Sequence, residues 1–297
     1  MTSIAAYVSD GIPERLATGG GDAGSTTRHF RLPEGTIAYD DRGSGPLVIM
    51  VPSLGDLRQE YRFLAAPVLA AGYRVVTVDL RGHGASSTGW PDYAASAVGS
   101  DLLALVRHLD AGPAILIGTS LGAGAAVWAA AEAPDLLRGL VLIGPVVRDV
   151  PASSALKGLL QRLVIWTLFA GPWAPASWSA YYGSLYRSRK PADLRQYRKA
   201  LAANLREPGR LRALKAMMWA SKADIEARHP DVAAPTLVVM GSRDPDFSSP
   251  AAEAELVAAR LRGSAVMIEG AGHYPHAEMP DETAPHILDF IGRIGGK

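Results

Sequence analysis

The stretch 114–124, with the sequence AILIGTSLGAG, decides the fold. Its first four residues are apolar and predict a buried strand, and the small residues that continue to Glu132 predict a helix. Between the two stands Ser120, with a glycine two residues before it and two after it. A residue on so sharp a strand-to-helix turn has strained dihedral angles, and flanking glycines let the two elements approach closely. The hydroxyl is thereby exposed over the amino end of a helix, which favours developing negative charge.

Composition predicts one large globular protein. The chain has 297 residues, of which 48% are hydrophobic and 20% are charged, enough for a substantial core. Its net charge of +1, without a basic block, gives no reason to expect nucleic acid or an anionic membrane as a partner. The absence of cysteine excludes disulfides, thiolate metal sites and cysteine nucleophiles.

Targeting signals are not apparent either. The first residues lack the basic and apolar regions of a secretory signal. The longest apolar run, residues 163–170, is far shorter than the ~18 residues that a membrane span needs. We therefore expect a cytoplasmic protein without a membrane span.

Strand and helix patterns alternate along most of the chain. Helical spacing is expected over residues 57–71, 93–109, 251–261 and 283–294. The expected strands are residues 30–32, 36–40, 47–51, 74–78, 114–117, 139–143, 236–240 and 265–268. Because most of these strands are apolar throughout, both of their faces must be covered. The alternation predicts an α/β fold with a mostly parallel central sheet and helices on both faces.

Four segments follow from this pattern. Residues 1–28 are polar and rich in glycine, and we expect a flexible leader. Residues 29–149 and 235–297 form the predicted α/β core domain. Residues 150–234 show helical patterns only, which predicts a helical cap (lid) inserted over the carboxyl edge of the sheet, where such sheets bind ligands.

A glycine-flanked serine can occur by chance in a chain with 31 glycines, so its partners matter. A serine hydroxyl becomes a good nucleophile when a base takes its proton and a carboxylate supports that base. Two later strands are followed by such residues, Asp244 in GSRD and His273 in GAGH. The chain order is Ser120, Asp244, His273.

Four motifs together resemble one known family. They are GTSLG at 118–122, DLRGHG at 79–84, GSRD at 241–244 and GAGHYPHAEMPDE at 270–282. From about residue 30 to its end, the chain resembles the α/β-hydrolase fold family of capped serine esterases and lipase-like hydrolases. The resemblance implies that Ser120 is the nucleophile, Asp244 the orienting acid and His273 the general base.

The resemblance also implies two backbone donors for an oxyanion hole. One is the N–H of Leu121, the residue after the nucleophile. The other is the N–H of Leu54, in the loop after the strand at 47–51. Pro52 and Ser53 stand where the family usually has His and Gly, which affects the shape of this loop. A backbone donor does not depend on those side chains.

Several residues compete for the same roles. Asp246 and Asp149 are alternatives to Asp244 as the acid. His276 is expected to be a structural group or to lie at the rim of the pocket. His83 and Arg81 are expected to stabilise their own loop.

The predicted cap is rich in aromatic residues. Some of these rings should face the cleft and others should pack in a small core, which favours an apolar acyl or ring-bearing substrate. They are Trp166, Trp173, Trp178, Tyr181, Tyr182 and Tyr186.

These features predict a serine hydrolase that cleaves a carboxylic ester of a small or medium-sized apolar molecule through an acyl-enzyme on Ser120. We expect such an enzyme to need no cofactor. We also expect no metal, because the seven histidines lack metal-binding spacing. Alternatives are a C–C bond hydrolase, a lactonase or amidase, an acyltransferase, a perhydrolase, or a ligand-binding receptor with little turnover. The sequence does not determine the natural substrate or the oligomeric state.

Overall fold

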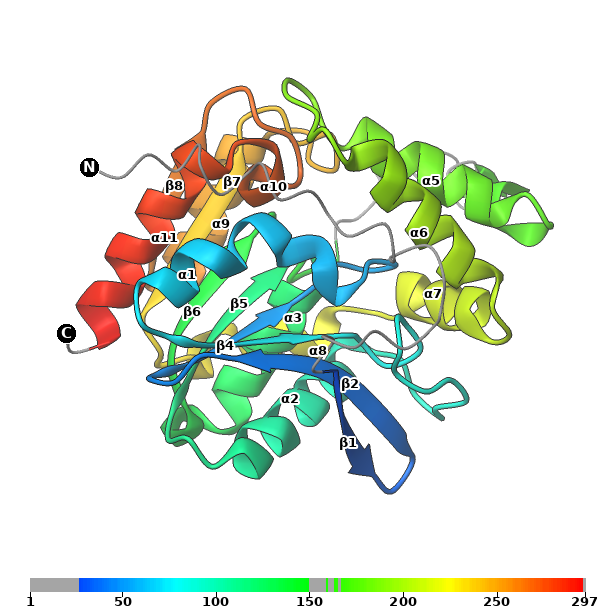
Figure 1. Ribbon diagram of the computed structural model, residues 1–297. Coiled ribbons are helices and arrows are strands. Elements are labelled where there is room, and N and C mark those ends of the chain that lie inside the picture. The colour runs from blue at the N-terminus through cyan, green and yellow to red at the C-terminus, as the bar shows by residue number, and fades with distance from the viewer. Residues whose placement is uncertain (1–26, 150–158, 160–162, 165–166, 296–297) are drawn as a thin grey trace.

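A single eight-stranded sheet forms the centre of the molecule (Figure 1). The computed structural model describes residues 27–149, 159, 163–164 and 167–295. Most of the expected leader and part of the expected cap, including Trp166, therefore lie outside the described residues. The order of the strands is β1-β2-β4-β3-β5-β6-β7-β8. Strand β2 pairs antiparallel with β1 and β4, and every other pairing is parallel.

The strands lie close to where the sequence predicts them. Strands β3, β5, β6 and β7 are buried over nearly their whole length, as expected for strands covered on both faces. The mostly parallel α/β fold is thus confirmed. The strands are β1 (Arg28–Leu32), β2 (Gly35–Arg42), β3 (Leu47–Val51), β4 (Arg74–Val78), β5 (Ala114–Thr119), β6 (Leu137–Ile143), β7 (Thr236–Gly241) and β8 (Ser264–Ile268).

Alternate residues of the strands pack into two separate layers. Ile49 and Leu116 belong to a core that includes α2 (Ala95–Leu109), α3 (Leu121–Glu132) and α9 (Pro250–Arg260). The neighbouring strand residues, such as Val48 and Ile117, pack instead with α1 (Ala65–Ala70) and α11 (Pro280–Gly295). This division follows from the two-residue period of a strand. Two further short elements are η4 (Pro134–Leu136) and α10 (Pro275–Glu278).

One expected helix differs in the structure. The spacing predicts a single helix over residues 57–71, but the chain forms a 3₁₀ helix, η3 (Arg58–Phe63), followed by α1. Pro67 explains the break, because a proline ring clashes with the carbonyl four residues earlier, here that of Phe63. The 3₁₀ turn buries Glu60 and Tyr61 beneath the ends of the central strands.

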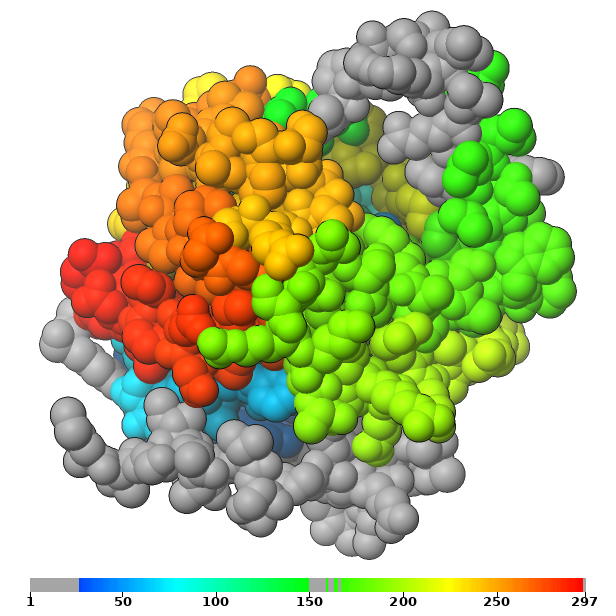
Figure 2. Space-filling model, turned by 90° about the horizontal axis from the view of Figure 1, so that it is seen from above, coloured from blue at the N-terminus to red at the C-terminus, as the bar shows by residue number. Residues whose placement is uncertain are grey.

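A helical segment follows β6 and lies beside the sheet, where α5, α6 and α7 gather in green to yellow (Figure 1). In Figure 2 the green residues of this segment pack against the orange residues that follow β7 and β8. His273 N–H donates to Leu185 O at 3.0 Å across this contact. The helices are α5 (Ala174–Ser184), α6 (Leu194–Arg206), α7 (Arg210–Trp219), α8 (Ala223–Ala227) and η5 (His229–Asp231).

Candidate active site

Ser120 occupies the sharp turn between β5 and α3. Its φ is 54° and its ψ is −113°, a conformation that a residue with a side chain rarely adopts. A Cβ on Gly122 would lie 2.4 Å from Val51 O, and a Cβ on Gly118 would lie 2.5 Å from Gly122 O. Only glycine fits at these two positions, so the pattern read from the sequence corresponds to a real close approach of strand and helix.

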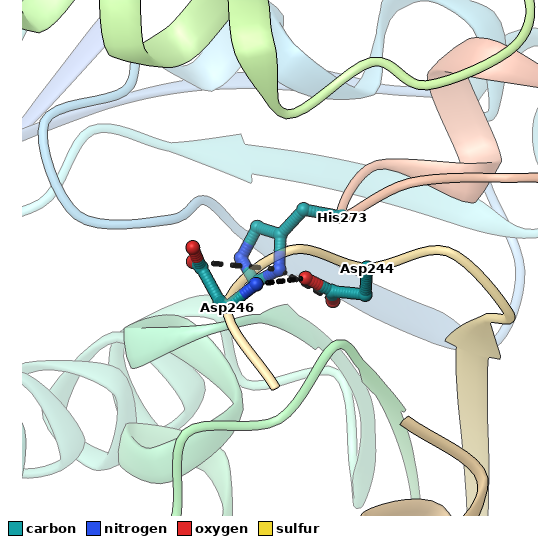
Figure 3. A group of neighbouring side chains, drawn as sticks. All are labelled: Asp244, Asp246 and His273. Carbon is teal, nitrogen blue, oxygen red and sulfur yellow. Dashed lines mark hydrogen bonds and ion pairs between the residues drawn. The ribbon is translucent and has the colours of Figure 1, made fainter. Parts of the chain in front are cut away.

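His273 follows β8 and points at a carboxylate that follows β7. Its Nδ1 lies 2.7 Å from Oδ2 of Asp244, and both side chains are buried (Figure 3). Because a carboxylate only accepts, Nδ1 donates here and Nε2 is the nitrogen left to take a proton. Oδ1 of Asp244 accepts the N–H of Asp246 at 3.0 Å, which fixes the carboxylate from its other side.

Asp246 is a more distant neighbour of the same imidazole. Its Oδ2 lies 3.8 Å from His273 Nδ1 (Figure 3). Both of its carboxylate oxygens accept from the Tyr181 hydroxyl, at 2.7 and 2.9 Å. Burial acts to lower the pKa of His273, but the charges of Asp244 and Asp246 outweigh it and hold that pKa above its usual range. The two carboxylates therefore stabilise the protonated form of the imidazole.

The remaining candidate residues lie elsewhere. Asp149 is exposed and accepts from Ser221 and from the N–H of Lys222. His83 is buried, with Nδ1 3.1 Å from the carbonyl of Arg81, and burial lowers its pKa to about 4.

Arg81 is also structural, because it forms a bidentate pair with Asp101 at 2.7 and 2.8 Å. His276 is not at a rim: it is buried, with its ring stacked on Tyr61.

Ser120 and His273 line the same cavity, whose volume is about 150 Å³. Its wall also contains Leu54 and Leu121, whose N–H groups are the expected oxyanion donors. The N–H of Leu121 begins α3, and the first N–H groups of a helix have no partner within that helix. Other lining residues are Ser53, Val146, Trp178, Tyr181, Leu185, Met217, Met218, Lys222, Asp246 and Tyr274.

The aromatic residues of the helical segment divide between cavity and core. Trp178 and Tyr181 line the cavity, whereas Tyr182 and Tyr186 pack with Tyr274 in a buried cluster. Trp173 is 52% exposed. The sequence predicts that some rings face the cleft, but it could not assign them individually.

The motifs assigned no role to three residues at or near the site. Lys222 lines the cavity, where its ammonium donates to Ala220 O at 2.7 Å, and burial lowers its pKa. Glu278 is buried and accepts the N–H of Gly272 at 2.7 Å, which holds the loop of His273. Glu60 is buried beneath residues 52–55. Of these, only Glu278 lies within a recognised motif, at 270–282.

The oxygens of Asp244 and Asp246 and a ring nitrogen of His273 lie within 4.8 Å of one another, near enough to share a cation. The hydrogen bond between Asp244 and His273 already uses two of these ligand atoms. Within the described ranges, no helix is long and apolar enough to cross a membrane.

Comparison with known proteins assigns the class. Residues 48–286 match the model of the alpha/beta hydrolase family, and the chain therefore belongs to that family. The resemblance of the four motifs to the α/β-hydrolase fold family is thereby confirmed.

Two curated relatives and one solved structure illustrate the family's range. The chain is 30% identical over 264 residues to a 2-(acetamidomethylene)succinate hydrolase of Mesorhizobium japonicum, covering 86% of this chain and 91% of that one. It is 26% identical over 273 residues to the mouse sn-1-specific diacylglycerol lipase ABHD11, covering 88% and 85%. A bromoperoxidase of Bacillus anthracis has the same fold, with a TM-score of 0.77 and 21% identity over 90% of this chain and all of its own.

Proposed function

We propose that the protein is a serine hydrolase that cleaves a carboxylic ester of a small or medium-sized, largely apolar molecule. One observation carries the proposal: His273 lies between the carboxylate of Asp244 and the cavity that Ser120 also lines. Nucleophile, base and carboxylate come from three loops at the same edge of the sheet, as the reaction requires.

The reaction would proceed through an acyl-enzyme. Nε2 of His273 takes the proton of Ser120 as Oγ attacks the carbonyl carbon, and the N–H groups of Leu121 and Leu54 hold the resulting oxyanion. The C–O bond to the leaving alcohol then breaks, and the imidazolium gives the alcohol its proton. Water, deprotonated by His273, cleaves the acyl-enzyme and restores Ser120. Asp244 keeps the imidazole in the required tautomer throughout.

The cavity supports a small substrate. Its volume of about 150 Å³ is below the range of about 300–1,000 Å³ that is typical of sites for drug-sized ligands. Leucine, valine, methionine and tryptophan side chains supply much of its wall, and they favour an apolar acyl group. We also propose that residues 150–234 act as a cap on a core of 29–149 and 235–297, in a cytoplasmic enzyme without a cofactor.

A fluorophosphonate probe tests the nucleophile directly. Wild-type protein should be labelled at Ser120, and Ser120→Ala should lose the label and several orders of magnitude in kcat on p-nitrophenyl esters. Ser177→Ala, in α5 and outside the cavity lining, is the matched control and should keep both. Labelling that survives Ser120→Ala, or wild-type protein that neither reacts nor hydrolyses esters, would contradict the proposal.

The same three residues could serve other reactions of the family. A panel of esters, lactones, amides, C–C ring-fission substrates, alcohol acceptors and peracid formation would separate the esterase from the alternatives. Labelling without turnover on any member of the panel would favour a ligand-binding receptor.

One observation favours a second candidate, the hydrolysis of an amide in a small molecule that carries a carboxylate. Lys222 lines the cavity together with apolar side chains, the carboxylate of Asp246 and the imidazole of His273. An ammonium there would bind an anionic group of the substrate. The relative from Mesorhizobium is named for a substrate that is both a succinate and an acetamide.

Lys222→Met tests this second candidate. The substitution should raise KM at least tenfold for a substrate with a carboxylate and leave KM for a neutral ester of similar size nearly unchanged. Lys215→Met, in α7 and outside the cavity lining, is the control for loss of a cation from this segment. An equal effect on both substrates would rule out a carboxylate-binding role for Lys222.

A further inference from the structure

Two buried carboxyl groups lie behind the turn of residues 52–55, and the proposed reaction uses neither. Asp56 and Glu60 are both 0% exposed. A buried carboxyl group is costly unless hydrogen bonds compensate it, so its partners reveal what it stabilises.

Glu60 holds the first peptide of the turn. Its Oε2 accepts the N–H of Ser53 at 2.7 Å, within the buried interior. The next peptide unit contains Ser53 C=O and Leu54 N–H, and that carbonyl accepts the N–H of Asp56 at 3.2 Å. Because C=O and N–H of a trans peptide point in opposite directions, fixing the carbonyl fixes the direction of the Leu54 N–H.

The helix that carries Glu60 is itself attached to the strand ends. The hydroxyl of Tyr61, the next residue, lies 2.8 Å from Val51 O and 2.8 Å from Thr119 Oγ1. Val51 ends β3 just before the turn, and Thr119 directly precedes Ser120. One short helix thus holds the turn and the start of the nucleophile's loop together.

The second oxygen of Glu60 and the carboxyl of Asp56 lie beside further buried groups. Its Oε1 lies 3.1 Å from Nε2 of His276, which burial keeps neutral by lowering its pKa to about 3. Asp56 Oδ1 accepts from the hydroxyl of Tyr197 in α6 at 2.5 Å and from the N–H of Leu57 at 2.8 Å. The carboxyl pair therefore connects the turn to the helical segment as well.

We propose that Glu60 is a positioning residue for the oxyanion hole: its carboxyl oxygen on the Ser53 N–H orients the turn so that the Leu54 N–H faces the cavity beside Ser120. The inference rests on the proposed function. It also gives a physical reason why a turn with Pro52 and Ser53 can keep a backbone donor in place.

Three variants separate the hydrogen bond from the charge. Glu60→Gln keeps an acceptor oxygen and removes the ionisable group, Glu60→Leu removes the acceptor, and Glu60→Asp withdraws it by one methylene. Glu253→Leu is the control for loss of a buried carboxylate, because Glu253 lies in α9, outside the cavity lining, and pairs with Arg148. Circular dichroism and thermal melts select the variants that fold.

The readouts are kcat and KM on a p-nitrophenyl ester, the Kd of a trifluoromethyl ketone that forms a tetrahedral adduct, and the rate of fluorophosphonate labelling. Removal of one oxyanion donor typically lowers kcat about 10²–10³-fold. Because Leu54 would be displaced but not removed, Glu60→Leu should lower kcat about 10- to 100-fold. The affinity for the ketone should fall by a similar factor, with KM nearly unchanged. Glu60→Gln and Glu253→Leu should stay within a few-fold of wild type.

If Glu60→Leu does not fold, Glu60→Asp is used instead. It should lower kcat and the affinity for the ketone by a smaller factor. A folded Glu60→Leu or Glu60→Asp with wild-type kcat and ketone affinity would overturn the inference. So would Glu60→Gln if it were as impaired as Glu60→Leu. Failure of wild-type protein to label at Ser120 would instead count against the proposed function.

Discussion

At the scale of single residues, two carboxylates act on one imidazole with different geometry. Asp244 is at hydrogen-bond distance from His273 Nδ1, whereas the nearest oxygen of Asp246 is 3.8 Å away. Asp244 can therefore fix the tautomer and stabilise the charge, while Asp246 can only contribute its charge. The sequence leaves open which aspartate is the acid. In the structure, Asp244 can act through a hydrogen bond to His273, and Asp246 can act only through its charge.

The pH profile of kcat/KM should distinguish the two. The imidazole acts as a base only when neutral, so its raised pKa moves the rising limb to a pH above the usual value of about 6.5. Asp246→Asn removes one negative charge and should shift this limb down by about one pH unit, since a charge 4 Å away contributes between ~1 and ~4 kcal/mol. Asp244→Asn should lower kcat by several orders of magnitude at every pH.

Tyr181→Phe is the control for this experiment. It removes the hydrogen bonds to Asp246 but keeps the charge, so the limb should stay above pH 6.5. If the rising limb of the pH profile stays at the same pH in Asp246→Asn, this carboxylate does not affect the pKa of His273. A mild effect of Asp244→Asn would transfer the role of acid to another residue.

The site residues that stand in motifs could be predicted from the sequence. The residues that contact the same loops or line the same cavity could not. Ser120, Asp244 and His273 each stand in a short loop after an apolar strand, and that placement is visible in sequence. Glu60 contacts Ser53 only because a 3₁₀ turn buries it. Lys222 reaches the cavity from a segment without a distinctive pattern.

At the scale of elements, α5 forms part of the cavity wall through one large ring. Trp178 is 4% exposed, packs against Phe169 and Tyr181, and donates from Nε1 to Gly55 O at 3.1 Å. It thus limits the space above Ser120 and also contacts the turn that carries Leu54. Trp173 directly precedes α5 but is exposed, so its substitution is a matched control for the loss of a tryptophan ring.

Trp178→Ala should change the preference for acyl length. The lost ring leaves space for a longer chain, so kcat/KM for butyrate or hexanoate p-nitrophenyl esters should rise at least several-fold relative to acetate. Stability should fall by about 3–5 kcal/mol, the usual cost of truncating a buried tryptophan. Trp173→Ala should change neither. An unchanged acyl profile in folded Trp178→Ala would remove this residue from the pocket hypothesis.

Helices and strands with a clear pattern of apolar residues were predicted well. Elements that depend on a proline or that are very short were not. Strand β3 matches the expected residues, because a continuous apolar run between turns has one consistent interpretation. The expected helix over 57–71 is divided at Pro67, where backbone sterics override apolar spacing. Helix α10 is four residues long and has too few turns to show a period.

At the scale of the whole molecule, one buried polar cluster joins the sheet, the turn of residues 52–55 and the helical segment. Glu60 comes from η3, His276 from α10 and Tyr197 from α6, and Asp56 directly follows the turn. Ion pairing between Arg62 and Asp193, at 2.6 and 3.0 Å, adds a second link to the same segment. Such a cluster favours one arrangement of these parts, but burying its carboxyl groups has a cost that depends on pH.

For Glu60, the cost of burying the carboxyl group can be measured as a change of stability with pH. Burial raises its pKa from 4.5 to about 7, although the hydrogen bond from Ser53 opposes the shift. Between these two pH values the folded protein binds more protons at this site than the unfolded chain. Stability therefore falls as pH rises through this window, by as much as about 3 kcal/mol for this one group. The titratable groups around it are Asp56, Tyr61, Tyr186, Tyr197, His273, Tyr274 and His276.

Glu60→Gln removes the ionisable group and should remove this dependence. The free energy of unfolding of the variant, minus that of wild type, should rise by about 2–3 kcal/mol between pH 5 and pH 8, as measured by urea denaturation at each pH. Glu255→Gln makes the same change on the exposed face of α9 and should show no comparable rise. A flat difference for Glu60→Gln would mean that the carboxyl is compensated at every pH. In that case the cluster would stabilise the turn without a cost at high pH.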